Sequence, residues 1–84
     1  MNSLNTLMKQ LYEMKNREQT LTSAFECDMV PKNILTAIRE QKPNTPKVLK
    51  DGETVSGMFS YNEINVMVTM NFLRGTYTVK LAII

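Results

Sequence analysis

Apolar side chains recur along this chain with two different periods, and the change falls near the middle. Up to about residue 27 they are mainly three and four residues apart, which is typical of one face of an amphipathic helix. The positions on this face are Leu4, Leu7, Leu11, Met14, Leu21 and Phe25. From residue 48 to residue 84 apolar and polar residues alternate, as in strands with one buried face. The sequence predicts one α+β domain over 1–84, with a helical half at 1–42 and an antiparallel sheet half at 47–84.

The first helix should begin at a cap formed by Asn2 or Ser3 and end by about Cys27. Glu18 falls where the apolar face needs a hydrophobic residue, which leaves two interpretations. In one, the helix bends or ends early and Glu18 lies at the rim of the core. In the other, Glu18 is a buried polar group that fixes the register of a helix pair formed with a second chain.

A second helix should open at Pro31, because proline is favoured in a first turn, with Asp28 accepting hydrogen bonds from that turn. Its end is expected before Pro43. The apolar face of this helix comprises Val30, Ile34, Leu35 and Ile38.

A meander of three to four strands should follow, in the overall order α-α-β-β-β-β. Segments 47–50 and 53–61 are expected to pair across Asp51 and Gly52, since Asp-Gly adopts the positive φ angles of a type I′ turn. Turns at 62–63 and 73–75 should connect the remaining strands. The residues predicted to face the core are Ile64, Val66, Val68, Met70, Phe72, Tyr77, Val79, Leu81 and Ile83.

The size of the chain favours association with another chain. A core built from 84 residues provides little spare stability, and the first helix has a coiled-coil-like spacing. We therefore expect a homodimer, with Leu7, Leu11 or Met14 in its interface or packed beneath it. Cys27 is the only cysteine, and no apolar run resembles a signal peptide or a membrane span. These features predict a cytoplasmic protein without disulfides or contact with a membrane.

The residue types argue against catalysis. The chain has no histidine, one cysteine and three glycines, so the usual zinc sites, histidine-assisted nucleophiles and glycine-rich phosphate loops cannot be assembled. The carboxylates are scattered, without the spacing of a calcium loop. We expect no enzymatic activity, no metal and no cofactor.

Two features suggest a surface that binds a protein. Alternation places Met58 and Met67 on the outer face of the sheet, where flexible thioethers suit an irregular partner surface. The alternative is that one of the chain's own helices, or a dimer mate, covers them. The chain also ends on apolar residues up to Ile84, so the last strand is either paired on both sides or offers its edge to another chain by β-augmentation.

A basic segment provides a second functional hypothesis. Between residues 32 and 50 five cations stand against Glu40 alone, although the net charge of the chain is only +2. These cations are Lys32, Arg39, Lys42, Lys47 and Lys50. They form either an ordinary solvated surface or a patch that binds RNA or DNA phosphates.

In its general pattern, a compact α+β chain without catalytic residues, the protein is similar to small phage-encoded accessory proteins that bind and inhibit a host or defence factor. The resemblance implies a non-catalytic regulator or inhibitor that occupies the surface of a protein partner. An RNA- or DNA-binding module that uses the basic segment is the alternative.

Overall fold

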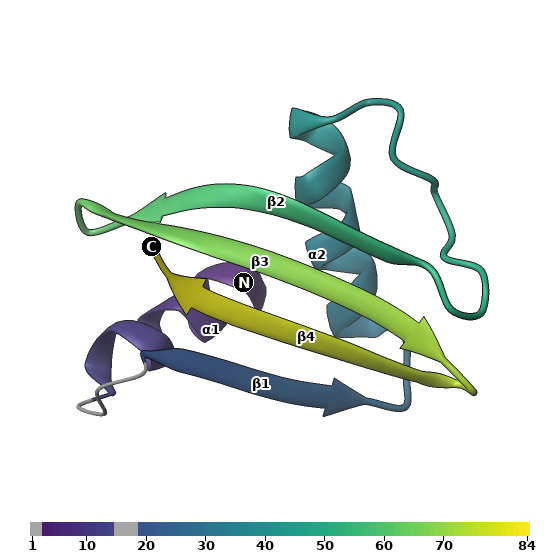
Figure 1. The fold of residues 1–84 in the computed structure, drawn as a ribbon, viewed down its shortest axis with the longest axis horizontal. Helices are drawn as coiled ribbons and strands as arrows, with labels where there is room; N and C mark the ends of the chain where they lie inside the picture. Colours follow the sequence, from purple (N-terminus) through teal and green to yellow (C-terminus); the bar gives the residue numbers. More distant parts are fainter. Residues whose placement is uncertain (1–2, 15–18) are drawn as a thin grey trace.

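The computed structural model describes residues 3–14 and 19–84, which form two helices and a four-stranded antiparallel sheet. The elements are α1 (Ser3–Glu13), β1 (Thr20–Phe25), α2 (Met29–Gln41), β2 (Thr54–Tyr61), β3 (Ile64–Leu73) and β4 (Thr76–Ile83). The strand order is β1-β4-β3-β2, so β1 and β2 are the edges. Both helices lie on the same face of the sheet (Figure 1). The predicted α+β class is confirmed.

The core fills the space between this helical layer and the inner face of the sheet. Its buried side chains are Leu4, Leu7, Met8 and Leu11 of α1, Ile34, Leu35 and Ile38 of α2, Val66, Val68 and Met70 of β3, Val79 and Leu81 of β4, and Leu49. Half-buried residues at the inward positions of all four strands extend it. The facing predicted for β3 and β4 is therefore confirmed.

The apolar face of α1 is used within the chain. Leu7 and Leu11 are buried in the core, and Met14 packs against it. These side chains therefore pack within a single chain, and their expected place in or beneath a dimer interface stays a prediction. None of the helices in the described part of the chain is long and apolar enough to cross a membrane.

The first helix is shorter than the sequence predicts. It ends at Glu13, and Thr20–Phe25 is a strand that pairs antiparallel with β4. The helical half expected at 1–42 thus contributes the edge strand β1, so the order α-α-β-β-β-β is wrong at this element. Glu18 lies outside the described residues, and both interpretations of it stay open.

The error has a simple geometric cause. Leu21 and Phe25 are four residues apart, a spacing that keeps two side chains on one face of a helix and also on one face of a strand. Both are half-buried on the inner face of the sheet, opposite Leu81 and Tyr77 of β4. The β-branched residue Thr22 between them favours the strand.

Helix α2 also departs from the expected start. It begins at Met29, and the side chain of Asp28 makes no capping hydrogen bond. Instead the backbone carbonyl of Asp28 accepts from the Lys32 N–H at 2.8 Å, while its carboxylate lies 3.6 Å from the Lys32 ammonium group. The expected cap is therefore replaced by an exposed ion pair.

The hairpin expected across Asp51 and Gly52 is not present, because 47–50 is not a strand. Leu49 is buried and anchors this segment to the core. The turn packs against the end of the β3–β4 hairpin: the Gly52 N–H donates to the Phe72 carbonyl at 2.6 Å, and Asp51 Oδ1 accepts from the Arg74 N–H at 2.6 Å. Gly52 has φ +87°, a conformation that glycine adopts without strain.

Candidate protein-binding surface

The outer face of the sheet is the one that α1 and α2 leave open (Figure 1). On this face Met58 of β2 is directly opposite Met67 of β3, and Met67 is opposite Ala82 of β4. Thr20 of β1 is the other partner of Ala82. These four residues form one row across all four strands, which we call the methionine row.

The methionine row is exposed to solvent at its β2–β3 end. Met58 is 47% and Met67 41% exposed. Since both helices lie on the opposite face, the interpretation that the chain's own helices cover these methionines is wrong for the described residues. A dimer mate or another protein is left as the covering group.

Mostly small, uncharged side chains surround the row. One neighbouring row joins Ser56, Thr69, Lys80 and Thr22, and the next joins Thr54, Asn71, Thr78 and Ala24. All outward positions of the four strands are described, and Lys80 is the one charged residue among them. Burying this face therefore requires the desolvation of few charges, which suits a protein interface more than a nucleic-acid interface.

Ile84 lies next to the methionine row, but not at an edge of the sheet. Its N–H donates to the Asn65 carbonyl at 3.0 Å, which extends the ladder between β3 and β4 beyond Ile83. Its side chain is 66% exposed. Because β4 pairs with β1 on one side and β3 on the other, β-augmentation at the last strand is wrong; of the two interpretations, ordinary central packing holds.

Two of the five residues in the predicted basic segment form polar contacts within the chain, and a third is half-buried. Lys32 pairs with Asp28. Arg39 is half-buried, and its buried Nε has no hydrogen-bond partner in the structure. Lys42 Nζ donates to the backbone carbonyl of Ser56 at 3.0 Å.

The remaining two members, Lys47 and Lys50, are exposed in the segment that joins α2 to β2. Neither forms an ion pair with an acid in the described part of the chain. Lys32 and Arg39 thus lie on α2, Lys42 directly follows it, and Lys47 and Lys50 lie on the loop that leads to β2. None of the contacts described above gathers the five cations into one phosphate-binding site.

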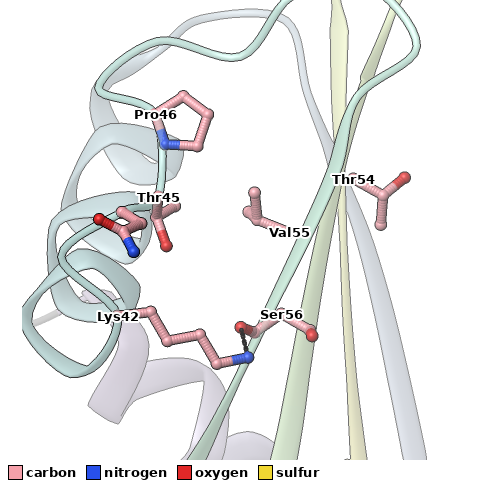
Figure 2. A pocket seen from close by; sticks show the side chains of 7 residues that line it. Lys42, Thr45, Pro46, Thr54, Val55 and Ser56 are labelled. Atoms are coloured by element: carbon pink, nitrogen blue, oxygen red, sulfur yellow. Dashed lines mark hydrogen bonds between the residues drawn. The ribbon is translucent and has the colours of Figure 1, made fainter.

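Lys42 lines a pocket of about 510 Å³ between the loop after α2 and the edge strand β2. Figure 2 shows Thr45 and Pro46 on the loop side, and the side chain of Val55 directed toward the loop. Thr54 points away from it. The ammonium group of Lys42 donates one hydrogen bond to the strand backbone, which holds this side chain against β2 at the pocket.

The edge of β2 is capped by the end of α2, a feature that sequence reasoning did not detect. The side-chain amide of Gln41 donates to the Met58 carbonyl at 2.5 Å and accepts from the Met58 N–H at 3.2 Å, which imitates the pairing of a neighbouring strand. With Lys42 bound to Ser56, two side chains thus occupy this edge. Gly57 permits the close approach: a Cβ there would lie 3.1 Å from Gln41 Oε1.

The described residues offer no cluster of three or more potential metal-ligating side chains. Comparison of the chain with protein-family models, with curated protein sequences and with solved structures found no match. The function is therefore argued from the geometry of the chain itself.

Proposed function

We propose that this protein is a small non-catalytic binding protein that regulates or inhibits a protein partner by covering part of its surface. The observation that carries the proposal is the exposed pair of Met58 and Met67, directly opposite each other on the open face of the sheet. Single exposed apolar side chains are ordinary on protein surfaces. Two flexible thioethers in contact range within an almost uncharged face form a continuous apolar strip, which a partner can desolvate at low cost.

An inhibitory role in the manner of phage accessory proteins, and a cytoplasmic location, are parts of this proposal. Both rest on the sequence pattern: the lack of catalytic residue types and a single cysteine, exposed in the structure. A homodimer is also proposed, with an interface separate from the methionine row.

Nucleic-acid binding through Lys32, Arg39, Lys42, Lys47 and Lys50 is the weaker candidate, because three of these side chains are paired or half-buried within the chain. The two functions differ in their response to salt. Phosphate binding falls steeply as salt rises, whereas an apolar interface does not.

The test is affinity capture from the native source with wild-type protein and with a variant carrying Met58→Lys and Met67→Lys. Neither side chain is in the core, so circular dichroism should show an unchanged fold. Two desolvated lysines in the centre of the interface should reduce the bound partner at least about tenfold, the scale of a central interface residue. Nuclease treatment in parallel separates protein partners from nucleic acid.

The matched control places the same charges on other exposed apolar residues. Met29 is 73% and Val48 69% exposed, and neither belongs to the sheet. A variant with Met29→Lys and Val48→Lys should capture the partner as the wild type does. Equal capture by both variants would refute the proposed surface, and retention only on RNA or DNA at low salt would favour the alternative function.

A further inference from the structure

The two edges of the sheet differ in how their backbone groups are used. On β2, Gln41 and Lys42 bind backbone groups of Met58 and Ser56 that point away from β3, at the edge of the sheet. The opposite edge, β1, has no such cap among the described residues.

The pairing with β4 defines which groups of β1 are open. The Gln19 carbonyl accepts from the Ile83 N–H at 3.2 Å, which extends the ladder in which alternate residues of β1 bond to β4. In an antiparallel strand the N–H and C=O of one residue point to the same side, and those of the next residue point to the other side. The backbone groups of Thr20, Thr22 and Ala24 therefore point away from β4, toward the open edge. Such an uncapped edge is a template for another strand.

Strand β1 is suited to pairing with a copy of itself. Its sequence, Thr-Leu-Thr-Ser-Ala-Phe, contains no charge, so an antiparallel pair brings no like charges together within the strand. Leu21 and Phe25 keep half-buried apolar side chains on the inner face at this edge. An apolar hollow of about 210 Å³ lies beside Phe25, lined also by Leu7 and Val30.

We propose that two copies of this chain associate through β1, paired antiparallel about a two-fold axis at Ser23, to form one continuous eight-stranded sheet. This inference rests on the edge and is independent of the function proposed for the methionine row. In this register Leu21 of each copy is opposite Phe25 of the other. Leu21 of the second copy would then add apolar surface next to Phe25 and the hollow beside it.

The register follows from alternation. Only registers that place inward-facing residues opposite inward-facing residues keep both faces of the sheet continuous. A pair centred on Thr22 would set Leu21 opposite Ser23, and a pair centred on Leu21 would leave Phe25 beyond the partner's strand. Centring on Ser23 pairs Leu21 with Phe25 twice, so it buries the most apolar surface.

The assembly should stop at two copies. The contact is isologous, because the same strand is used by both copies. The free edges of the resulting sheet are the two β2 strands. On each of them Gln41 and Lys42 occupy three of the backbone groups that a further strand would need, namely the N–H and C=O of Met58 and the C=O of Ser56. A closed dimer, and no fibre, is the expected product.

The first test removes from β1 a backbone N–H that points away from β4. Ala24→Pro eliminates a donor that faces away from β4 and adds bulk at the edge, a position where strands accept proline. Sedimentation velocity should show the wild type at twice the chain mass of 9.6 kDa near 100 µM, and the variant at the single mass. Ser56→Pro removes a backbone N–H that points away from β3 at the other edge of the sheet, and this variant should remain dimeric. A wild-type monomer, or a dimer unaffected by Ala24→Pro, would overturn the proposal.

Cysteine cross-linking tests the register without relying on the proline variant. In a Cys27→Ser background, Ser23→Cys should form an intermolecular disulfide on mild oxidation, because the Cα atoms of a directly opposite pair without hydrogen bonds are about 4.5 Å apart. Ala24→Cys in the same background is the control and should not cross-link, since it is opposite Thr22. Cross-linking through Thr22→Cys instead of Ser23→Cys would overturn the register.

Discussion

The register of the central strand β3 can be tested by placing a charge at each of two adjacent positions. Val68 is fully buried on the inner face, opposite Gly57 of β2 and Leu81 of β4. Thr69 is half-exposed on the outer face, opposite Ser56 and Lys80. Val68→Asp and Thr69→Asp introduce the same side chain into the same strand, so the difference between them isolates the effect of the face.

The cost at Val68 is comparable to the whole stability of the domain. Losing a buried valine costs about 1.5–3 kcal/mol, and leaving an uncompensated charge in the interior costs about 3–5 kcal/mol more. At about 0.05–0.15 kcal/mol per residue, 84 residues give roughly 4–13 kcal/mol of unfolding free energy. Val68→Asp should therefore leave little or no cooperative transition in urea at neutral pH, as followed by circular dichroism.

Acidification should partly restore the Val68→Asp variant. Burial raises the pKa of the introduced carboxyl group, because the neutral form is easier to hold in the core. The folded state then binds the proton more tightly than the unfolded state, so stability falls as the pH rises and recovers as it is lowered toward the unfolded-state pKa. A loss of stability that did not depend on pH would argue against burial of this side chain.

Thr69→Asp should change the unfolding free energy by no more than about 0.5 kcal/mol, as expected for an exposed face. The new carboxylate lies opposite the exposed Lys80, and a cross-strand pair of opposite charges contributes about 0.2–1 kcal/mol in compensation. Equal loss of stability in the two variants would refute the facing assigned to β3.

Two smaller perturbations test the contacts that position the edges and turns. Gly57→Ala should lower the unfolding free energy in urea by about 1–3 kcal/mol, because its Cβ would lie 3.1 Å from both Gln41 Oε1 and Phe59 Cε2 and 3.3 Å from the buried Ile38 Cγ1. It should also speed hydrogen exchange of the Met58 N–H that Gln41 holds. Asp51→Ala should cost about 0.5–1.5 kcal/mol by removing the acceptor for the Arg74 N–H, measured by thermal unfolding; an unchanged midpoint would show that this bond does not hold the turn against β3–β4.

The sheet half was predictable because its signal is local. From Ile64 to Ile83 the alternation of side chains determines the facing of every residue, and two short turns determine which strands are neighbours. At Asn62 and Glu63, as at Arg74 and Gly75, both residues have positive φ, so each connection is a tight turn between antiparallel strands. Pairing between consecutive strands needs no information from distant parts of the chain.

Strand β1 was not predictable in the same way. Its six residues are too few to separate the two periods, because Leu21 and Phe25 satisfy both. Its strand conformation depends on pairing with β4, more than fifty residues later in the chain. The segment 47–50 shows the reverse error: Asp51 and Gly52 do form a turn, but Leu49 is buried as an anchor in a loop rather than as part of a ladder.

The candidate surface was predictable only to the level of facing. Alternation placed Met58 and Met67 outside the core, but only the positions of the helices show that the face is open. The cap formed by Gln41 could not be foreseen, because a glutamine at the end of a helix carries no sign of the strand edge beside it. The same holds for Ile84, whose place beside a central strand depends on where β1 pairs.

The two proposed interfaces would act together. In the β1-paired dimer the two-fold axis is perpendicular to the sheet, so the outer faces of both copies point the same way and both methionine rows lie on one surface. With strands about 4.8 Å apart, seven strand spacings separate the two Met58 positions by roughly 34 Å across the sheet. The register centred on Ser23 also shifts the two rows by six residues along the strands, about 20 Å at 3.3 Å per residue, so the Met58 positions would be roughly 39 Å apart. A two-fold symmetric partner could engage both rows at once, and the second contact would then be intramolecular and strengthen binding without any new residue. Ala24→Pro should therefore weaken the capture of such a partner while leaving each single site intact, whereas the change at Met58 and Met67 removes the sites themselves.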